Sequence, residues 1–100
     1  MNVVWSPRAI ARATEIATDI AADRPAATCR WVDELFAKVA SLKDHSRRGR
    51  GVPEFGRAAV REVLQGAYPV IYRMDPTPIV VLTVRRGPRA WDPGEVEADE

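Results

Sequence analysis

The 100-residue sequence predicts an α+β domain of two layers, in which an antiparallel helical hairpin packs on an antiparallel sheet. Three observations predict this fold class. Apolar residues recur at three- and four-residue steps through residues 7–24 and 25–43, as in amphipathic helices. Runs rich in Val, Ile and Tyr follow between residues 59 and 86, separated by turn residues. A short β-prone stretch, residues 2–5, precedes the helices, so the expected element order is β-α-α-β-β-β.

Capping and breaking residues bound the two helices. Ser6 is a good N-cap, and Pro7 suits the first turn because its missing N–H would be unpaired there. Pro25 disfavours the helical conformation at Arg24, so it ends the first helix and starts the second. The short break predicts a helical hairpin. Its apolar stripe should consist of Ala9, Ile10, Ala13, Ile16, Ala17 and Ile20, then Val32, Leu35, Phe36, Val39 and Leu42.

Three strands are expected at residues 59–65, 68–74 and 79–86, with turns at residues 66–67 and 75–78. Pro69 cannot donate to a strand ladder, so it should lie near a strand start or face an unpaired position. Strict alternation along the third strand predicts two faces. One carries Val80, Leu82, Val84 and Arg86, and the other carries Ile79, Val81, Thr83 and Arg85.

The charges are segregated along the chain, although the formal net charge is only +1. Residues 1–44 carry six bases and six acids, whereas residues 45–89 carry nine arginines and three acids, a net +6. Residues 90–100 carry five acids and no base, a net −5. We therefore expect one domain over residues 1–89 and an acidic tail over residues 90–100. The basic half indicates an acidic partner, nucleic acid or protein, or else a solvated face.

Several function classes find no support in the sequence. No apolar run approaches the ~20 residues needed to cross a bilayer, and the first ten residues lack the pattern of a signal peptide. One cysteine, Cys29, fits a reducing cytoplasm, where we expect the protein to reside. Because Cys29 and the single histidine, His45, do not form a set of metal ligands, no metal site is expected, and no cofactor motif is present.

Arginine makes up thirteen of the fifteen basic residues, and its planar fork pairs bidentately with phosphate or carboxylate. Tyr68, Tyr72 and Trp91 are candidates for stacking on bases, but a tyrosine on a half-buried strand is more often part of the core. Nuclease chemistry would need an acid or a base beside the arginines. Glu62 is expected to pair with a neighbouring arginine, so no general acid–base pair is predicted.

From Val3 to Arg89 the sequence resembles the ParE/RelE superfamily, the toxins of type II toxin–antitoxin (plasmid stabilisation) modules, and is most similar to ParE. The resemblance rests on the opening strand and helix, on the closing strands, and on the pattern G-R-x-V-P-E-[FY], here Gly49, Arg50, Val52, Pro53, Glu54 and Phe55. Three positions depart from the family pattern. Pro69 replaces an arginine, Arg86 replaces a histidine, and Val63 replaces a lysine that some messenger-RNA-cleaving members carry.

The resemblance implies a toxin that inhibits DNA gyrase by binding it and that a cognate antitoxin neutralises. The implied target- and partner-binding residues are Arg57, Arg61, Arg73, Arg85, Arg86, Arg89 and Trp91. One alternative is a RelE-like, ribosome-dependent mRNA endoribonuclease with Arg61, Tyr72, Arg73 and Arg86 as its catalytic candidates. Another is a degenerate member that has lost toxicity and only binds antitoxin or operator DNA.

Overall fold

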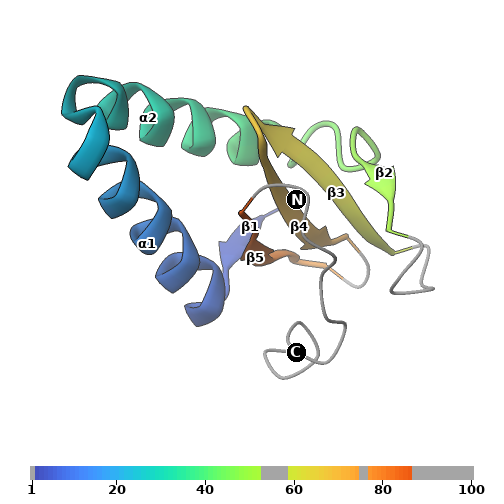
Figure 1. Ribbon diagram of the computed structural model, residues 1–100. Helices are drawn as coiled ribbons and strands as arrows, with labels where there is room; N and C mark the ends of the chain where they lie inside the picture. Colours follow the sequence, from blue (N-terminus) through green and yellow to red (C-terminus); the bar gives the residue numbers. More distant parts are fainter. Residues whose placement is uncertain (1, 53–58, 75–76, 87–100) are drawn as a thin grey trace.

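The computed structural model describes residues 2–52, 59–74 and 77–86, and its α+β architecture confirms the predicted fold class (Figure 1). Two helices pack on one face of a five-stranded sheet. The elements in chain order are β1 (Val3–Trp5), α1 (Pro7–Asp23), α2 (Pro25–Ser41), β2 (Arg50–Gly51), β3 (Val60–Gln65), β4 (Tyr68–Arg73) and β5 (Ile79–Val84). No helix among the described residues is both long and apolar enough to span a membrane.

The sheet has the order β1-β5-β4-β3-β2, and it is mixed where the sequence predicted an antiparallel one. The predicted meander β3-β4-β5 is antiparallel, but β1 pairs with β5 in parallel, Val3 opposite Ile79 and Trp5 opposite Val81. Strand β2, which the sequence did not predict, pairs with β3 at the other edge. Alternation of side chains along a strand indicates which face of the sheet each residue takes, but it gives no information about the direction of the neighbouring strand. The sequence therefore did not indicate that β1 and β5 pair in parallel.

A β-bulge overturns the predicted faces of β5. Ile71 pairs with Thr83 and the next residue, Tyr72, pairs with Val81, so Leu82 is an extra residue without a partner. An extra residue reverses the alternation beyond it. Val84 therefore packs with Val81 in the core beneath the helices, whereas Leu82 packs on the opposite face of the sheet.

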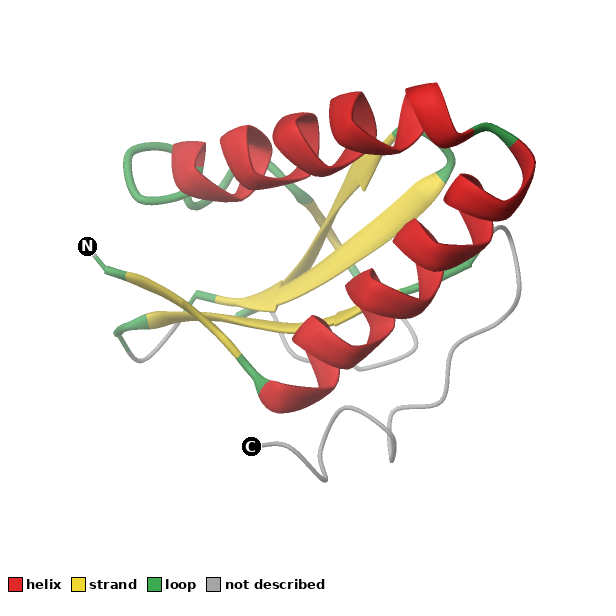
Figure 2. Cartoon of the chain, turned by 90° about the vertical axis from the view of Figure 1, so that its left-hand side faces the viewer, coloured by secondary structure: helices red, strands yellow, loops and turns green. Residues whose placement is uncertain are grey.

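The helices begin and end where the sequence predicts, except that α2 ends at Ser41 rather than near Lys43. Ser6 caps α1 by accepting a hydrogen bond from the Ala9 N–H at 3.0 Å, and its own hydroxyl donates to the Leu82 carbonyl at 2.9 Å. This second bond fixes the start of α1 against β5. The helices form the arms of an open hairpin, joined at Arg24 and spread at their other ends (Figures 1 and 2).

The main core lies between the helices and the sheet. It is formed by Ala9, Ile16, Ile20, Trp31, Leu35, Val39, Val70, Val81 and Val84. The edge of Trp31 meets the ring of Tyr68 with centroids 5.4 Å apart, so Tyr68 is a packing residue as expected from its strand position. Pro69 is the second residue of β4, near the strand start as predicted, and its carbonyl accepts a bond from the Arg85 N–H. Two residues of the predicted stripe, Ile10 and Phe36, are instead exposed.

Candidate functional site

The structure divides the arginines that the sequence grouped together. Arg61 pairs with Tyr72, and Arg73 pairs with Val80 near the start of β5. Arg85 and Arg86 follow the far end of β5, so the two groups lie roughly 15–20 Å apart along the strand. The remaining candidates, Arg57, Arg89 and Trp91, fall outside the described residues.

Arg86 lies on the helix side of the sheet, because the bulge brings Val84, and Arg86 two residues further on, to the same face as Val81. Its guanidinium makes a 2.5 Å ion pair with Asp19 on α1, and both side chains remain more than half exposed. Arg73 takes the other face by alternation, since Val70 and Tyr72 pack beneath the helices and Ile71 packs opposite. The predicted arginines therefore do not share one surface.

Tyr72 is fully buried, and its hydroxyl holds the loop that joins α2 to β2. The hydroxyl donates to the Ser46 carbonyl at 2.6 Å and accepts from the Gly49 N–H at 3.0 Å. Arg61 supports the same loop, because its Nη1 donates to the Gly49 carbonyl at 2.8 Å. Both residues are candidates for nuclease chemistry in the sequence. In the structure the Tyr72 hydroxyl and the Arg61 Nη1 instead anchor the backbone of their own chain.

Burial raises the pKa of Tyr72 above the ordinary value of 10.0, because the phenolate would lose hydration. The Gly49 N–H and the charges of Arg61 and Arg48 act in the opposite direction but do not cancel the effect of burial. A hydroxyl kept protonated can continue to donate to Ser46, so the loop anchor is maintained at neutral pH.

The raised pKa of Tyr72 predicts a loss of stability in alkali. In the unfolded chain Tyr72 ionises near pH 10, whereas in the folded chain it stays protonated to a higher pH. Its contribution to the free energy of unfolding is therefore complete below pH 10 and decreases as the pH rises through the folded pKa, by up to about 1.4 kcal/mol per pH unit. Urea unfolding from pH 8 to pH 11 should show a steeper decrease for the parent protein than for Tyr72→Phe. Parallel profiles would contradict the assignment.

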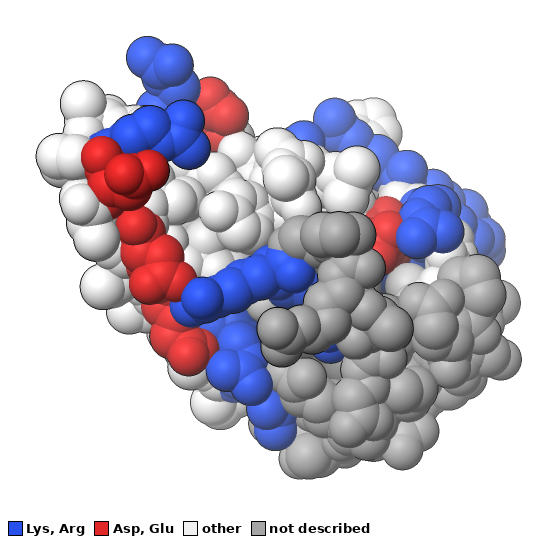
Figure 3. Space-filling view, in the orientation of Figure 1, with Lys and Arg blue, Asp and Glu red and all other residues white. Residues whose placement is uncertain are grey.

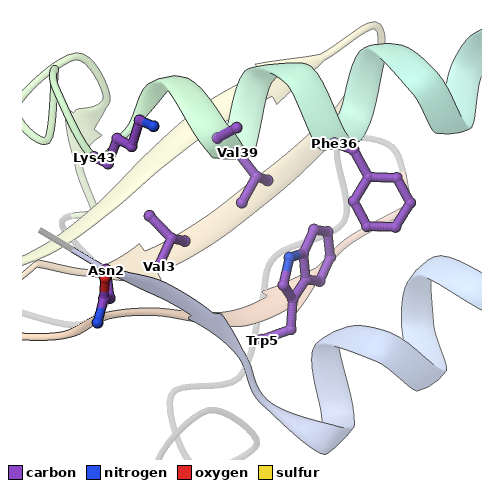
Figure 4. Close-up of a pocket in the computed structure, with 7 residues that line it drawn as sticks. Asn2, Val3, Trp5, Phe36, Val39 and Lys43 are labelled. Carbon is purple, nitrogen blue, oxygen red and sulfur yellow. The ribbon is translucent and has the colours of Figure 1, made fainter.

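A groove opens between β1 and the second half of α2, with about 380 Å³ of open space (Figure 4). Val3 and Trp5 line one wall, and Phe36 and Val39 line the other. The rings of Trp5 and Phe36 meet with centroids 5.4 Å apart, yet Phe36 remains 55% exposed. Lys43 lies at one end of the groove, so this apolar groove carries a positive charge at that end. The sequence missed this site, because helical spacing alone assigned Phe36 to the core.

A second surface is strongly basic. The segment Lys43–Arg50, hereafter the basic loop, connects α2 to the first residue of β2, and its charged side chains are exposed. Figure 3 shows Lys and Arg atoms gathered on the side of the molecule where β2 lies. Glu62 pairs with Arg50 at 2.7 Å, as the sequence predicted for that carboxylate.

Within the described residues, no three His, Cys, Asp or Glu side chains lie close enough together to share a metal ion. Cys29 is exposed near the start of α2. The described surface carries an apolar groove and an arginine-rich loop, which suit binding of a macromolecular partner.

Comparisons with known proteins place the chain in a family. The family model described as "ParE toxin of type II toxin-antitoxin system, parDE" matches residues 3–91. A solved structure described as "Chromosomal ParDE TA system from P. aeruginosa" has a similar fold, with a TM-score of 0.72 and 20% sequence identity over 88% of this chain and 97% of that chain. No curated protein sequence matches the chain. Since the family model covers most of its length, the chain belongs to the ParE toxin family of type II toxin–antitoxin systems.

Proposed function

We propose that this ParE-type toxin inhibits DNA gyrase by binding it, without catalysing a reaction, and that a cognate antitoxin neutralises it. The observation that supports binding over catalysis is the internal use of Tyr72 and Arg61. Tyr72 is buried and bonded through its hydroxyl to Ser46 and Gly49, and Arg61 bonds the same loop. A nuclease would need such groups directed at its substrate. The remaining exposed arginines can bind a phosphate or a carboxylate through charge-assisted hydrogen bonds.

The proposed gyrase contact lies at the end of β5, where Arg85 and Arg86 precede Arg89 and Trp91 in the sequence. The resemblance also implies Arg61 and Arg73, which lie near the start of β5, and their distance from Arg86 makes them a separate contact. Arg57, which it implies as well, lies outside the described residues. Arg86 is the residue to test first, because its side chain is exposed and its ion pair with Asp19 can be removed separately by substituting the aspartate.

The proposed antitoxin site is the groove between β1 and α2. The neighbour with this fold comes from a ParDE system, and an antitoxin partner follows from the family. The resemblance implies an antitoxin segment that is acidic and amphipathic and that folds on binding. Such a segment fits the groove, since its apolar side chains would cover Trp5 and Phe36 and its acids would meet Lys43. Covering these residues would also remove apolar surface from water.

Purified toxin added to gyrase and supercoiled plasmid is expected to accumulate cleaved DNA, and antitoxin added first should prevent this. Arg86→Ala should reduce the cleaved product at least tenfold, because one charge-assisted contact is worth about 1.5–3 kcal/mol. Asp19→Ala is the matched control, since it removes the same ion pair and leaves the Arg86 guanidinium in place.

The opposite results have distinct meanings. Site-specific cleavage of messenger RNA on translating ribosomes, lost in Arg86→Ala, would replace the proposal with the endoribonuclease alternative. Gyrase that is unaffected, together with normal growth on induction, would indicate a member that only binds its antitoxin. An equal loss in Arg86→Ala and Asp19→Ala would assign Arg86 a structural role.

A further inference from the structure

The basic loop concentrates positive charge in a short segment. It carries Lys43, Arg47, Arg48 and Arg50 against the single acid Asp44, which is a net +3 over eight residues. Arg50 is partly neutralised by Glu62, whereas Arg48 bonds a neutral hydroxyl, Ser41 Oγ, at 2.9 Å. Among the described residues, neither Lys43 nor Arg47 has an ion-pair partner. Three cations of the basic loop are thus available to an anionic ligand.

The backbone of the basic loop is held in one conformation. At its start the N–H groups of Asp44 and His45 bond the Ser41 carbonyl, and the Arg48 N–H bonds the His45 carbonyl. Near its end the Tyr72 hydroxyl bonds the loop backbone, and β2 then pairs with β3. A fixed backbone lowers the conformational entropy lost when the arginines bind, which favours recognition of a regularly charged surface.

The basic loop lacks the groups that other polyanionic partners require. Protein interfaces usually depend on aromatic and arginine side chains packed into desolvated pockets, and sites for single-stranded nucleic acid combine charge with aromatic stacking. Residues 43–50 contain no aromatic residue except His45, and Leu42 beside them is buried. The apolar groove provides aromatic anchors of that kind and adjoins the basic loop at Lys43, but neither Arg47 nor Arg48 lines it. A rigid, polar, arginine-rich surface is instead typical of contacts to the backbone of a duplex.

We propose that the basic loop binds the phosphate backbone of duplex DNA, with Arg47 and Arg48 as the principal contacts and Lys43 beside them. Arginine forks bind phosphate bidentately, and release of counterions supplies the affinity. The contact carries no sequence preference, because nothing in it reads base edges. It does not rest on the proposed inhibition of gyrase, since binding needs neither gyrase nor antitoxin.

The test is fluorescence anisotropy with purified full-length toxin and a labelled mixed-sequence DNA duplex of about 20 base pairs. Between about 50 and 200 mM NaCl, the logarithm of the binding constant should fall with the logarithm of the salt concentration at a slope of about −3, for three phosphate contacts. Arg47→Ala combined with Arg48→Ala should reduce the slope by about 2 and the affinity at least tenfold. Arg47→Ala alone removes no described contact, so weaker binding by this variant would not result from misfolding. Its slope should decrease by about 1.

The matched control is Arg24→Ala combined with Arg30→Ala. Both residues are exposed; Arg24 joins α1 to α2 and Arg30 lies in the first half of α2, whereas the basic loop follows the other end of that helix. The control has the same net charge as the loop variant. It should change the affinity no more than about twofold. Three results would overturn the proposal: no salt-dependent binding of the duplex, an equal loss in both double variants, or tighter binding of single-stranded DNA, duplex RNA or an acidic polypeptide of the same charge.

Discussion

Replacing Gly49 with alanine should lower the free energy of unfolding by about 2–4 kcal/mol, a large part of the stability of a domain of this size. A Cβ at Gly49 would lie 2.5 Å from the carbonyl oxygen of Glu62 and 2.8 Å from the Tyr72 hydroxyl oxygen. The first obstacle is strand backbone, so it cannot rotate away as a flexible side chain would. Moving the loop instead would break the bonds from Gly49 to Tyr72 and Arg61. Chemical denaturation monitored by tryptophan fluorescence would measure the loss.

Gly51→Ala is the matched control for Gly49→Ala. Gly51 lies two residues further along the chain, a Cβ at this position would meet no atom within 4 Å, and its φ is not positive. We expect its effect on the free energy of unfolding to stay within about 0.5 kcal/mol. A Gly49→Ala protein as stable as Gly51→Ala would show that the Tyr72 anchor does not constrain the loop.

The parts of the fold that the sequence predicted are those where local chemistry decides the outcome. Ser6 and Pro7 start α1 through capping and a fixed φ, and Pro25 separates the helices for a steric reason. Turn residues between Val-, Ile- and Tyr-rich runs likewise predicted the meander. The family resemblance, confirmed by the family model, came from the order of these pieces along the chain.

The features that the sequence did not predict depend on contacts between distant segments. Strand β2 has two residues, too few for any periodicity, and it exists because Arg50 and Gly51 find partners on β3. The bulge at Leu82 lies in a run of apolar residues, where alternation gives no contrast between faces. That bulge places Arg86 on the helix side of the sheet, where it pairs with Asp19. The sequence therefore could not show that Arg86 and Arg73 lie on different faces.

Phe36 shows the same limit within the candidate site. Its spacing from Val32 and Val39 fits the buried stripe of α2, but the helices spread apart at this end and leave its ring at the groove. Helical periodicity defines a face and says nothing about how far the partner element extends along it. The exposure of the Phe36 ring depends on the position of β1 opposite α2, which helical periodicity does not predict.

Phe36→Asp should weaken antitoxin binding at least a hundredfold. Aromatic anchors at the centre of an interface commonly contribute about 2 kcal/mol or more, and a carboxylate in their place must also be desolvated on binding, so a total of about 3 kcal/mol is expected. The new charge should also repel an acidic antitoxin segment near Lys43. Stability should decrease by only about 1 kcal/mol, because Phe36 is 55% exposed and loses chiefly its contact with Trp5. Isothermal titration with the purified antitoxin would measure the affinity.

Leu64→Asp provides the control with matched chemistry. Leu64 is 52% exposed, nearly the same as Phe36, but it lies on β3 and does not line the groove. The bond that Lys38 donates to Leu64 uses the backbone carbonyl, so the substitution leaves it available. Its affinity for antitoxin should stay within about threefold of the parent, since a surface substitution outside the interface changes binding little. If both variants lost affinity equally, the antitoxin would respond to total charge rather than to the groove; if neither did, the groove would not be its binding site.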